Sequence, residues 1–172
     1  LITCLVRNGV RPTILDLGSK EQSDETQAVV RGFWPDGSVR YEYVYEPNVP
    51  SVNGLLALVA KPAYRLYEWL KHKNFDVVHA PDFQGSLYFC LVAKEQGIAF
   101  TATRFVVHPV HRLLQIKMQE YQSIAEVQML PQVYLENSSL EKADTVPVLG
   151  RHHLHGLLDD GLVFSRDQIE EC

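Results

Sequence analysis

Two histidines and an aspartate stand where short apolar runs of this sequence end. His79 lies at the end of the run at residues 75–80 and Asp82 follows that run, while His108 follows the run at 99–107. A β-branched run that stops in a polar turn before an apolar helical stretch predicts a strand followed by a helix. Open parallel sheets bind ligands at the carboxyl ends of their strands. We therefore expect His79, Asp82 and His108 to reach a bound molecule there.

Each of these three residues also has a structural alternative. Asp82 comes shortly after a strand, which is a common position for a helix N-cap. His79 lies in an apolar strand end and is compatible with a hydrogen-bonded histidine of the core. His108 is compatible with an ordinary loop histidine, although loops carry functional residues disproportionately. For each residue the sequence leaves both alternatives open.

Other residues of chemical interest lie close to the second tip or further along the chain. Arg104 and Arg112 flank the tip at His108 and could meet a phosphate, although single arginines in loops are usually solvated. His152, His153 and His155 lack the i, i+4 spacing of a zinc-binding helix, so we expect a solvated helix start and no metal site.

The elements that must hold these residues alternate between strands and helices. Gly9 ends an amphipathic helical segment, residues 18–25 read as an exposed loop before a possible further strand, and residues 34–38 are a strong turn. Strands are expected at 12–17, 39–45, 75–80, 99–107 and 145–148, and helices at 51–71 (bent or broken at Pro62), 86–94, 112–128 (ended by Pro131), 133–143 and 151–160. Strands separated by helices predict an α/β domain with a mostly parallel sheet covered on both faces.

Composition narrows the partners. The 172 residues, 46% of them hydrophobic, suit one domain, and the net charge of −5 comes without a cluster of Lys and Arg. Nucleic acid and anionic lipid are therefore not expected as partners. The longest apolar run, residues 55–60, is too short to span a bilayer. Cys4 and Cys90 lie in apolar helical runs, which favours reduced core thiols and a cytoplasmic protein.

Four segments of the chain resemble GT-B glycosyltransferases, the group that contains glycogen and starch synthases and the family 4 enzymes. Residues 74–85 resemble the "DVVHxHDWxG" region of that group, and residues 133–146 are similar to its "ME-x-x-S-I-x-x-A-D-x-V" segment. Residues 9–15 resemble "GHEVTVL", and residues 105–108 resemble "TVH". The four segments follow the order of the family, so the resemblance extends over about residues 1–158.

This resemblance implies the N-terminal, acceptor-side half of a GT-B fold: a three-layer Rossmann-like domain over residues 1–161, incomplete at its start, with 162–172 as a tail or linker. The parent enzyme would be a retaining transferase that moves a hexose from a nucleotide sugar to a hydroxyl group of a sugar, glycan or small molecule. No metal or cofactor is implied beyond the nucleotide-sugar co-substrate. The resemblance implies His108 as the catalytic contact and, for substrate binding, His79, Asp82, Phe83, Arg104 and His111. Glu136, Ser139 and Asp144 are expected on a separate helix near this cleft, outside its floor.

Two departures limit the implied activity. The turn expected as "Ser-Pro-Ser-Arg" is Val148-Leu149-Gly150-Arg151 here, and no Glu-x7-Glu pair of the donor-binding half occurs anywhere in the sequence. Glycosyl transfer needs both walls of the cleft and cationic groups at the leaving diphosphate, so we expect the chain to be inactive without a donor domain. A non-catalytic Rossmann-like binding or interaction module is the alternative. An α/β hydrolase would need a Gly-x-Ser-x-Gly turn, which the sequence lacks.

Overall fold

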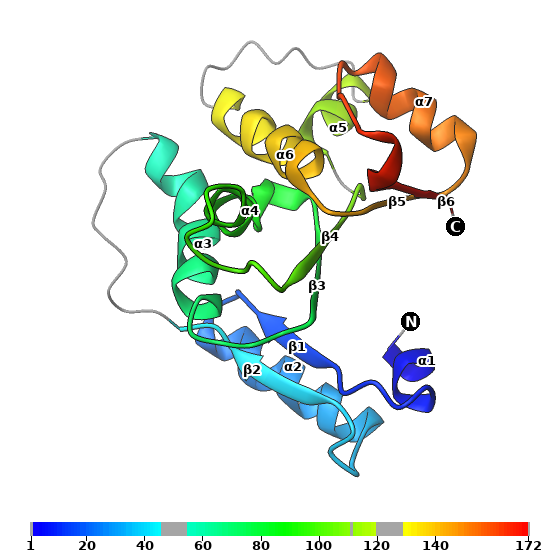
Figure 1. Cartoon of the computed structure of the whole chain (residues 1–172). Helices are drawn as coiled ribbons and strands as arrows, with labels where there is room; N and C mark the ends of the chain where they lie inside the picture. The colour runs from blue at the N-terminus through cyan, green and yellow to red at the C-terminus, as the bar shows by residue number, and fades with distance from the viewer. Residues whose placement is uncertain (1, 46–54, 111, 120–128, 172) are drawn as a thin grey trace. The chain divides into compact units, whose positions relative to one another are not determined.

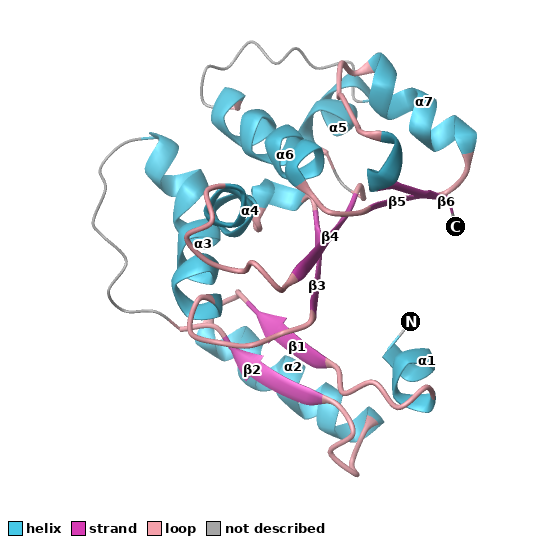
Figure 2. Ribbon diagram, viewed as in Figure 1, coloured by secondary structure: helices cyan, strands magenta, loops and turns pink. Residues whose placement is uncertain are grey.

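The chain forms two compact α/β units, Leu1–Pro47 and Asn48–Cys172. A computed structural model describes residues 2–45, 55–110, 112–119 and 129–171 of it (Figure 1). In these ranges the strands form parallel pairs separated by helices (Figure 2). The α/β class and the parallel pairing are those predicted.

The first unit is a β-α-β arrangement preceded by a short helix. Its elements are α1 (Ile2–Arg7), β1 (Thr13–Asp16), α2 (Lys20–Phe33) and β2 (Arg40–Tyr43), and Thr13 is in register with Arg40. Gly9, with a φ of 76°, follows α1 in the left-handed conformation that ends many helices. Burial of Val30 on α2, and of Val39 and Val44 at the two ends of β2, forms the small core of this unit.

Helix α2 replaces the loop and the further strand that the sequence suggested after Gly18. Its start is a capping box, in which Gln22 N donates to Ser19 Oγ at 3.3 Å and Ser19 N donates to Gln22 Oε1 at 3.3 Å. Lys20 and Asp24 form an i, i+4 ion pair of 2.6 Å on the exposed face. The polar composition of residues 18–25 is therefore that of a capped, solvated first helical turn.

The second unit follows the sequence β-α-β repeatedly. Its elements are α3 (Leu55–Leu70), β3 (Val77–Pro81), the 3-10 turn η1 (Phe83–Gly85), α4 (Tyr88–Glu95), β4 (Arg104–His108), α5 (Leu113–Gln119), α6 (Leu130–Lys142), β5 (Val146–Val148), α7 (Arg151–Asp159), the 3-10 turn η2 (Arg166–Gln168) and β6 (Ile169–Glu171). Strand β3 pairs with β4, and β5 pairs with β6. An isolated parallel bridge between Val106 and Thr145 leads from β4 toward β5.

The core of the second unit lies between its helices and β4. Helices α3, α4 and α6 contact one another. At Pro62, where the sequence predicts a bend or a break, α3 is not broken, and Ala63, Leu66 and Leu70 are buried beyond this residue. The largest contributions come from side chains exposed by 2% or less, each of which stabilises the fold by roughly 1.5–3 kcal/mol. Among the leucine, valine and phenylalanine side chains of this unit they are Leu70, Leu87, Leu91, Phe105, Val107, Leu135, Leu140, Val146, Val148 and Leu157.

Two sequence-based expectations about the chain's ends and cysteines change. Residues 162–172 were expected to be a tail or linker, yet this stretch contains η2 and β6, which pairs in parallel with β5. Cys90 is buried as predicted, and burial raises the pKa of its thiol. Cys4 is exposed instead of buried, because α1 is a six-residue helix with no buried residue. None of the helices in the described ranges is long and apolar enough to cross a membrane.

Candidate functional site

The carboxyl ends of β3 and β4 lie side by side in the second unit. The two strands are parallel with Pro81 in register with His108, and Asp82 N donates to His108 O at 2.9 Å. This is the arrangement that the sequence predicts for the two tips, because neighbouring parallel strands end at the same edge. Asp82 and His108 are therefore held together by backbone geometry, independently of their side chains.

His79 and His108 form a hydrogen-bonded imidazole pair on this edge. His79 Nδ1 and His108 Nε2 are 3.0 Å apart, and the ring centroids are 5.3 Å apart. Partial burial lowers the pKa of both rings, and the charge of His108 lowers that of His79 further; Asp82 opposes the effect at His108. Both rings are therefore neutral at pH 7, so one nitrogen of the pair donates and the other accepts. Although its ring is partly covered, His79 as a whole residue is exposed, which removes the core-histidine alternative.

The neutral pair presents a fixed combination of groups to a ligand. If His79 Nδ1 donates, His79 Nε2 is an acceptor and His108 Nδ1 is a donor; if His108 Nε2 donates, the two outer nitrogens exchange roles. In either tautomer the pair offers one donor and one acceptor. That combination matches a hydroxyl group, which both donates and accepts a hydrogen bond.

Asp82 links the two tip loops to each other. Its side chain is fully buried (0% exposed), and Oδ1 accepts a hydrogen bond from Val110 N at 3.1 Å. The residue precedes η1, but its carboxylate makes no capping hydrogen bond to that turn. The N-cap alternative is therefore not observed, and the carboxylate instead fastens the loop after β4 to the end of β3.

Glu136 holds both loops from a third element, α6. Its side chain is 1% exposed; Oε1 accepts from Gln84 N at 3.0 Å and from Gln132 Nε2 at 2.8 Å, while Oε2 accepts from Leu113 N at 2.8 Å. Burial raises the pKa of this carboxyl, and the three hydrogen bonds oppose that effect. Glu136 lies on a separate helix as expected, but sequence reasoning missed that it fastens Gln84 and Leu113, on both sides of the site, to α6.

The close approach of α6 to η1 fixes the first loop further. Gln84 and Gly85 both have positive φ angles, 56° and 59°. A Cβ atom on Gly85 would lie 2.5 Å from Leu135 Cβ and 2.6 Å from Leu135 O. Glycine is therefore required here for two reasons, its backbone conformation and the absence of space.

The sequence suggests Arg112 as a phosphate contact. In the structure its side chain is instead buried and holds other elements together. Its side chain is 1% exposed, Nη1 donates to Asp160 Oδ2 at 2.6 Å, and Nη2 donates to Asn137 Oδ1 at 2.8 Å. Both terminal nitrogens of the guanidinium thus serve α6 and the end of α7. A buried charge paired in this way is costly to disrupt.

Of the remaining predicted residues that the structure describes, Arg104 lies away from the tips and Phe83 lies beside one of them. Arg104 begins β4, at the opposite end of the strand from His108, and its Nε and Nη2 donate to Thr145 Oγ1 at 3.0 and 2.7 Å. Phe83 is 47% exposed on η1, beside Asp82. His111 lies outside the described residues.

Ser139 and Asp144 also serve the structure. Ser139 Oγ donates to Leu135 O within α6 at 2.7 Å. Asp144 follows that helix and accepts from Lys94 Nζ at 2.6 Å and from Phe105 N at 2.7 Å, which attaches α4 to the start of β4. Neither residue lies among the contacts of the tip loops described above.

The three histidines of α7, His152, His153 and His155, lie in the first half of that helix. His153 Nδ1 accepts from Leu149 N at 3.2 Å, at the start of the helix. Across the described ranges no group of three or more His, Cys, Asp or Glu side chains is placed to hold a metal ion.

Comparisons with known proteins identify no relative of this chain. A scan against models of protein families finds no match for this chain, and a search of curated proteins also finds none.

Proposed function

We propose that this chain is the acceptor-side half of a retaining GT-B glycosyltransferase, folded as a three-layer Rossmann-like domain and acting in the cytoplasm. The observation that carries the proposal is the placement of His79, Asp82 and His108 at the joined carboxyl ends of β3 and β4. These residues belong to two of the four segments that resemble the family. The proposal thus rests on a sequence likeness together with a ligand-binding position of parallel sheets.

In this proposal the histidine pair meets the sugar and the buried acids position the pair. The outer nitrogens of His79 and His108 supply a donor and an acceptor to hydroxyl groups at the reacting centre, with His108 as the catalytic contact. Asp82 and Glu136 keep the two loops in register through backbone N–H groups. Such preorganisation reduces the entropy that binding would otherwise cost.

The other substrate contacts proposed from the family are Phe83, Arg104 and His111. Phe83 offers an exposed ring next to the tip, whereas Arg104 would have to act from the far end of β4. The donor, a nucleotide sugar, would be held mainly by a donor domain as partner, since the sequence contains no Glu-x7-Glu pair. The chain alone is accordingly proposed to bind sugars weakly and to transfer none.

A binding experiment tests the tip directly. The imidazole resonances of the purified chain are followed by NMR during titration with glucose, maltotriose, UDP-glucose, ADP-glucose and GDP-mannose. We expect at least one sugar to shift the resonances of His79 and His108 saturably, because their outer nitrogens face the ligand. His108→Gln should weaken this binding about ten-fold, the size of one lost hydrogen bond in a ligand site.

His152→Gln is the matched control, because it removes an exposed histidine of α7 that is not at the tips. Equal effects of the two substitutions would contradict a site at the tips. The same five compounds are incubated with the chain and assayed for hexose transfer, and turnover by the chain alone would contradict the proposed need for a donor domain. Saturable binding of a sugarless ligand at the tips, with none of the five sugars bound, would instead support the non-catalytic binding module.

A further inference from the structure

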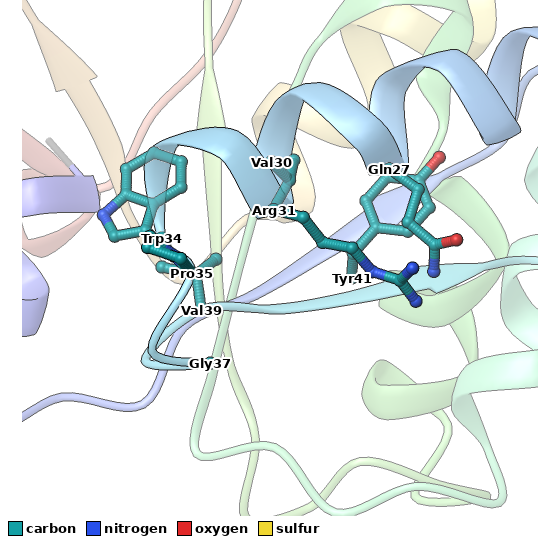
Figure 3. A pocket seen from close by; sticks show the side chains of 8 residues that line it. All are labelled: Gln27, Val30, Arg31, Trp34, Pro35, Gly37, Val39 and Tyr41. Carbon is teal, nitrogen blue, oxygen red and sulfur yellow. The ribbon is translucent and has the colours of Figure 1, made fainter.

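The first unit contains a pocket that the proposed function does not use. It lies between α2 and β2 and has a volume of about 430 Å³, within the range of small-molecule sites (Figure 3). The lining residues are Gln27, Val30, Arg31, Trp34, Pro35, Gly37, Val39 and Tyr41. Three of them, Gln27, Val30 and Arg31, recur at the helical spacing that places residues on one face of α2, and Trp34 follows as the residue that caps its C-terminus.

The pocket is lined by buried apolar residues and by aromatic side chains at its two ends. Val30 and Val39, each 6% exposed, are the buried apolar residues of the lining. Figure 3 shows Trp34 and Tyr41 at opposite ends, with the guanidinium of Arg31 at the end where Tyr41 lies. The hydroxyl group of Tyr41 is already engaged, with the carboxylate of Asp16 and with Ser23 O at 3.0 Å. Tyr41 therefore offers its ring, and not its hydroxyl group, to a ligand.

Two polar side chains of the pocket, those of Gln27 and Arg31, are available to a ligand. Arg31 is one helical turn beyond Gln27, and Figure 3 shows the guanidinium and the amide directed to the same end. Neither side chain forms a hydrogen bond or an ion pair within the part of the chain that the structure describes. The guanidinium keeps its rigid fork of donors, which matches a carboxylate or a phosphate, and the amide can add a further hydrogen bond.

We propose that this pocket binds a small planar molecule that carries one anionic group, either a carboxylate or a phosphate. The ring lies over Val30 and Val39 between Trp34 and Tyr41, and the anionic group accepts from Arg31. Arg31 is the one charged residue among those lining the pocket, so a single negative group is complementary to it. The proposal is independent of the glycosyltransferase assignment, since it uses none of the residues at the tips of β3 and β4.

Titration of the full chain with matched probes tests the proposal. The two tryptophans of the sequence give two indole N–H signals in an 1H–15N spectrum, which Trp34→Phe assigns. Benzoate, phenyl phosphate, the neutral benzamide and inorganic phosphate are added in parallel. We expect benzoate or phenyl phosphate to shift the Trp34 signal saturably, at least about ten-fold more tightly than benzamide, because a charge-assisted hydrogen bond is at stake. The carboxylate and phosphate arms identify which anion is preferred.

Two substitutions of equal charge separate the pocket from general electrostatics. Arg31→Gln should weaken the preferred probe about ten-fold. Arg40→Gln should leave its affinity unchanged, because Arg40 is exposed on β2 between two lining residues and alternation directs it to the other face. Equal losses in both variants, equal affinities for the anionic probes and benzamide, or no saturable shift would overturn the proposal. Inorganic phosphate binding as tightly as phenyl phosphate would overturn the aromatic part of it.

Discussion

The tips of β3 and β4 and the pocket between α2 and β2 use polar residues in opposite ways. At the tips, the carboxylates of Asp82 and Glu136 and the guanidinium of Arg112 are buried and bonded to backbone or side-chain groups, and two imidazoles face outward. In the pocket, the guanidinium of Arg31 and the amide of Gln27 are bonded to nothing in the described chain. Charged residues near the predicted site at the tips thus hold the loops in place. The polar groups that are available to a ligand lie in the pocket between α2 and β2 instead.

The two regions should respond differently to substitution. Removing one partner of a buried polar contact leaves the other without a hydrogen bond and costs stability. A surface side chain without such a contact can be removed with almost no change in the free energy of unfolding. Its removal can alter only what the surface binds. Four measurements test this difference.

The largest effect is expected for Gly85→Ala. The new Cβ would overlap Leu135 and would force a positive φ on alanine, so the free energy of unfolding should fall by more than about 3 kcal/mol. Gly97→Ala is the matched control, because Gly97 has a φ of 68° but no atom within 4 Å of the position that a Cβ would take; its cost should be about 1 kcal/mol. Urea unfolding measures both, and equal costs would show that α6 does not press on η1.

Glu136→Ala should follow in size. It leaves the backbone N–H groups of Gln84 and Leu113 without their acceptor, and we expect a loss of about 2–3 kcal/mol in urea unfolding. Glu141→Ala removes the same residue type from the exposed face of α6, where its carboxylate accepts one solvent-exposed hydrogen bond from Val163 N at 3.3 Å, and should cost less than about 0.5 kcal/mol. A Glu136→Ala variant as stable as Glu141→Ala would mean that the tips do not depend on this carboxylate.

A smaller effect is expected from pH. The folded-state pKa values of His79 and His108 lie below the ordinary 6.5, so the unfolded chain takes up protons first as the pH falls. Stability from this pair is fully present above about pH 6.5 and is lost progressively below it. Urea unfolding at pH 7.5 and 5.5 should show a greater loss for the natural chain than for a His79→Gln, His108→Gln double variant. Other titrating groups, including Glu136, are common to both proteins, and an identical loss would contradict the lowered pKa values.

The smallest effect is expected in the pocket. Arg31→Gln and Gln27→Ala remove side chains that make no hydrogen bond or ion pair in the described chain, and each should change the free energy of unfolding by less than about 0.5 kcal/mol. Circular dichroism during urea unfolding would measure this. A loss above about 1 kcal/mol in either variant would show that the side chain supports the first unit, and the contrast between the two regions would fail.

Much of the order of strands and helices could be predicted from the sequence, because the spacing of apolar residues and the positions of turn residues are local signals. The strands at Thr13–Asp16, Val77–Pro81 and Arg104–His108 and their parallel pairing agree with the prediction. Helix α2 was missed because its polar first turn resembles a loop, although Ser19 and Gln22 have the spacing of a capping box. Its buried contacts, Ser23 and Val30, are too few to give a clear apolar period.

The side-chain contacts of the tips could be predicted only in part. Strand ends are local, so the placement of Asp82 and His108 follows from the sequence. The role of Glu136 depends on α6 reaching two loops that are distant in the chain, and no local pattern encodes such a contact. The position of Arg104 was predicted wrongly because of a local error in a strand boundary. Strand β4 starts at Arg104, later than the run of apolar residues suggested.

The contacts of Glu136 also determine the order in which the tips can form. This residue is separated from Gln84 by 52 positions and from Leu113 by 23, so closing these contacts requires long loops of chain to be ordered first. During synthesis the first tip leaves the ribosome well before α6 exists. We therefore expect the loop after β3 to gain its final geometry late in folding, when α6 docks, and the histidine pair to be held in place only at that step.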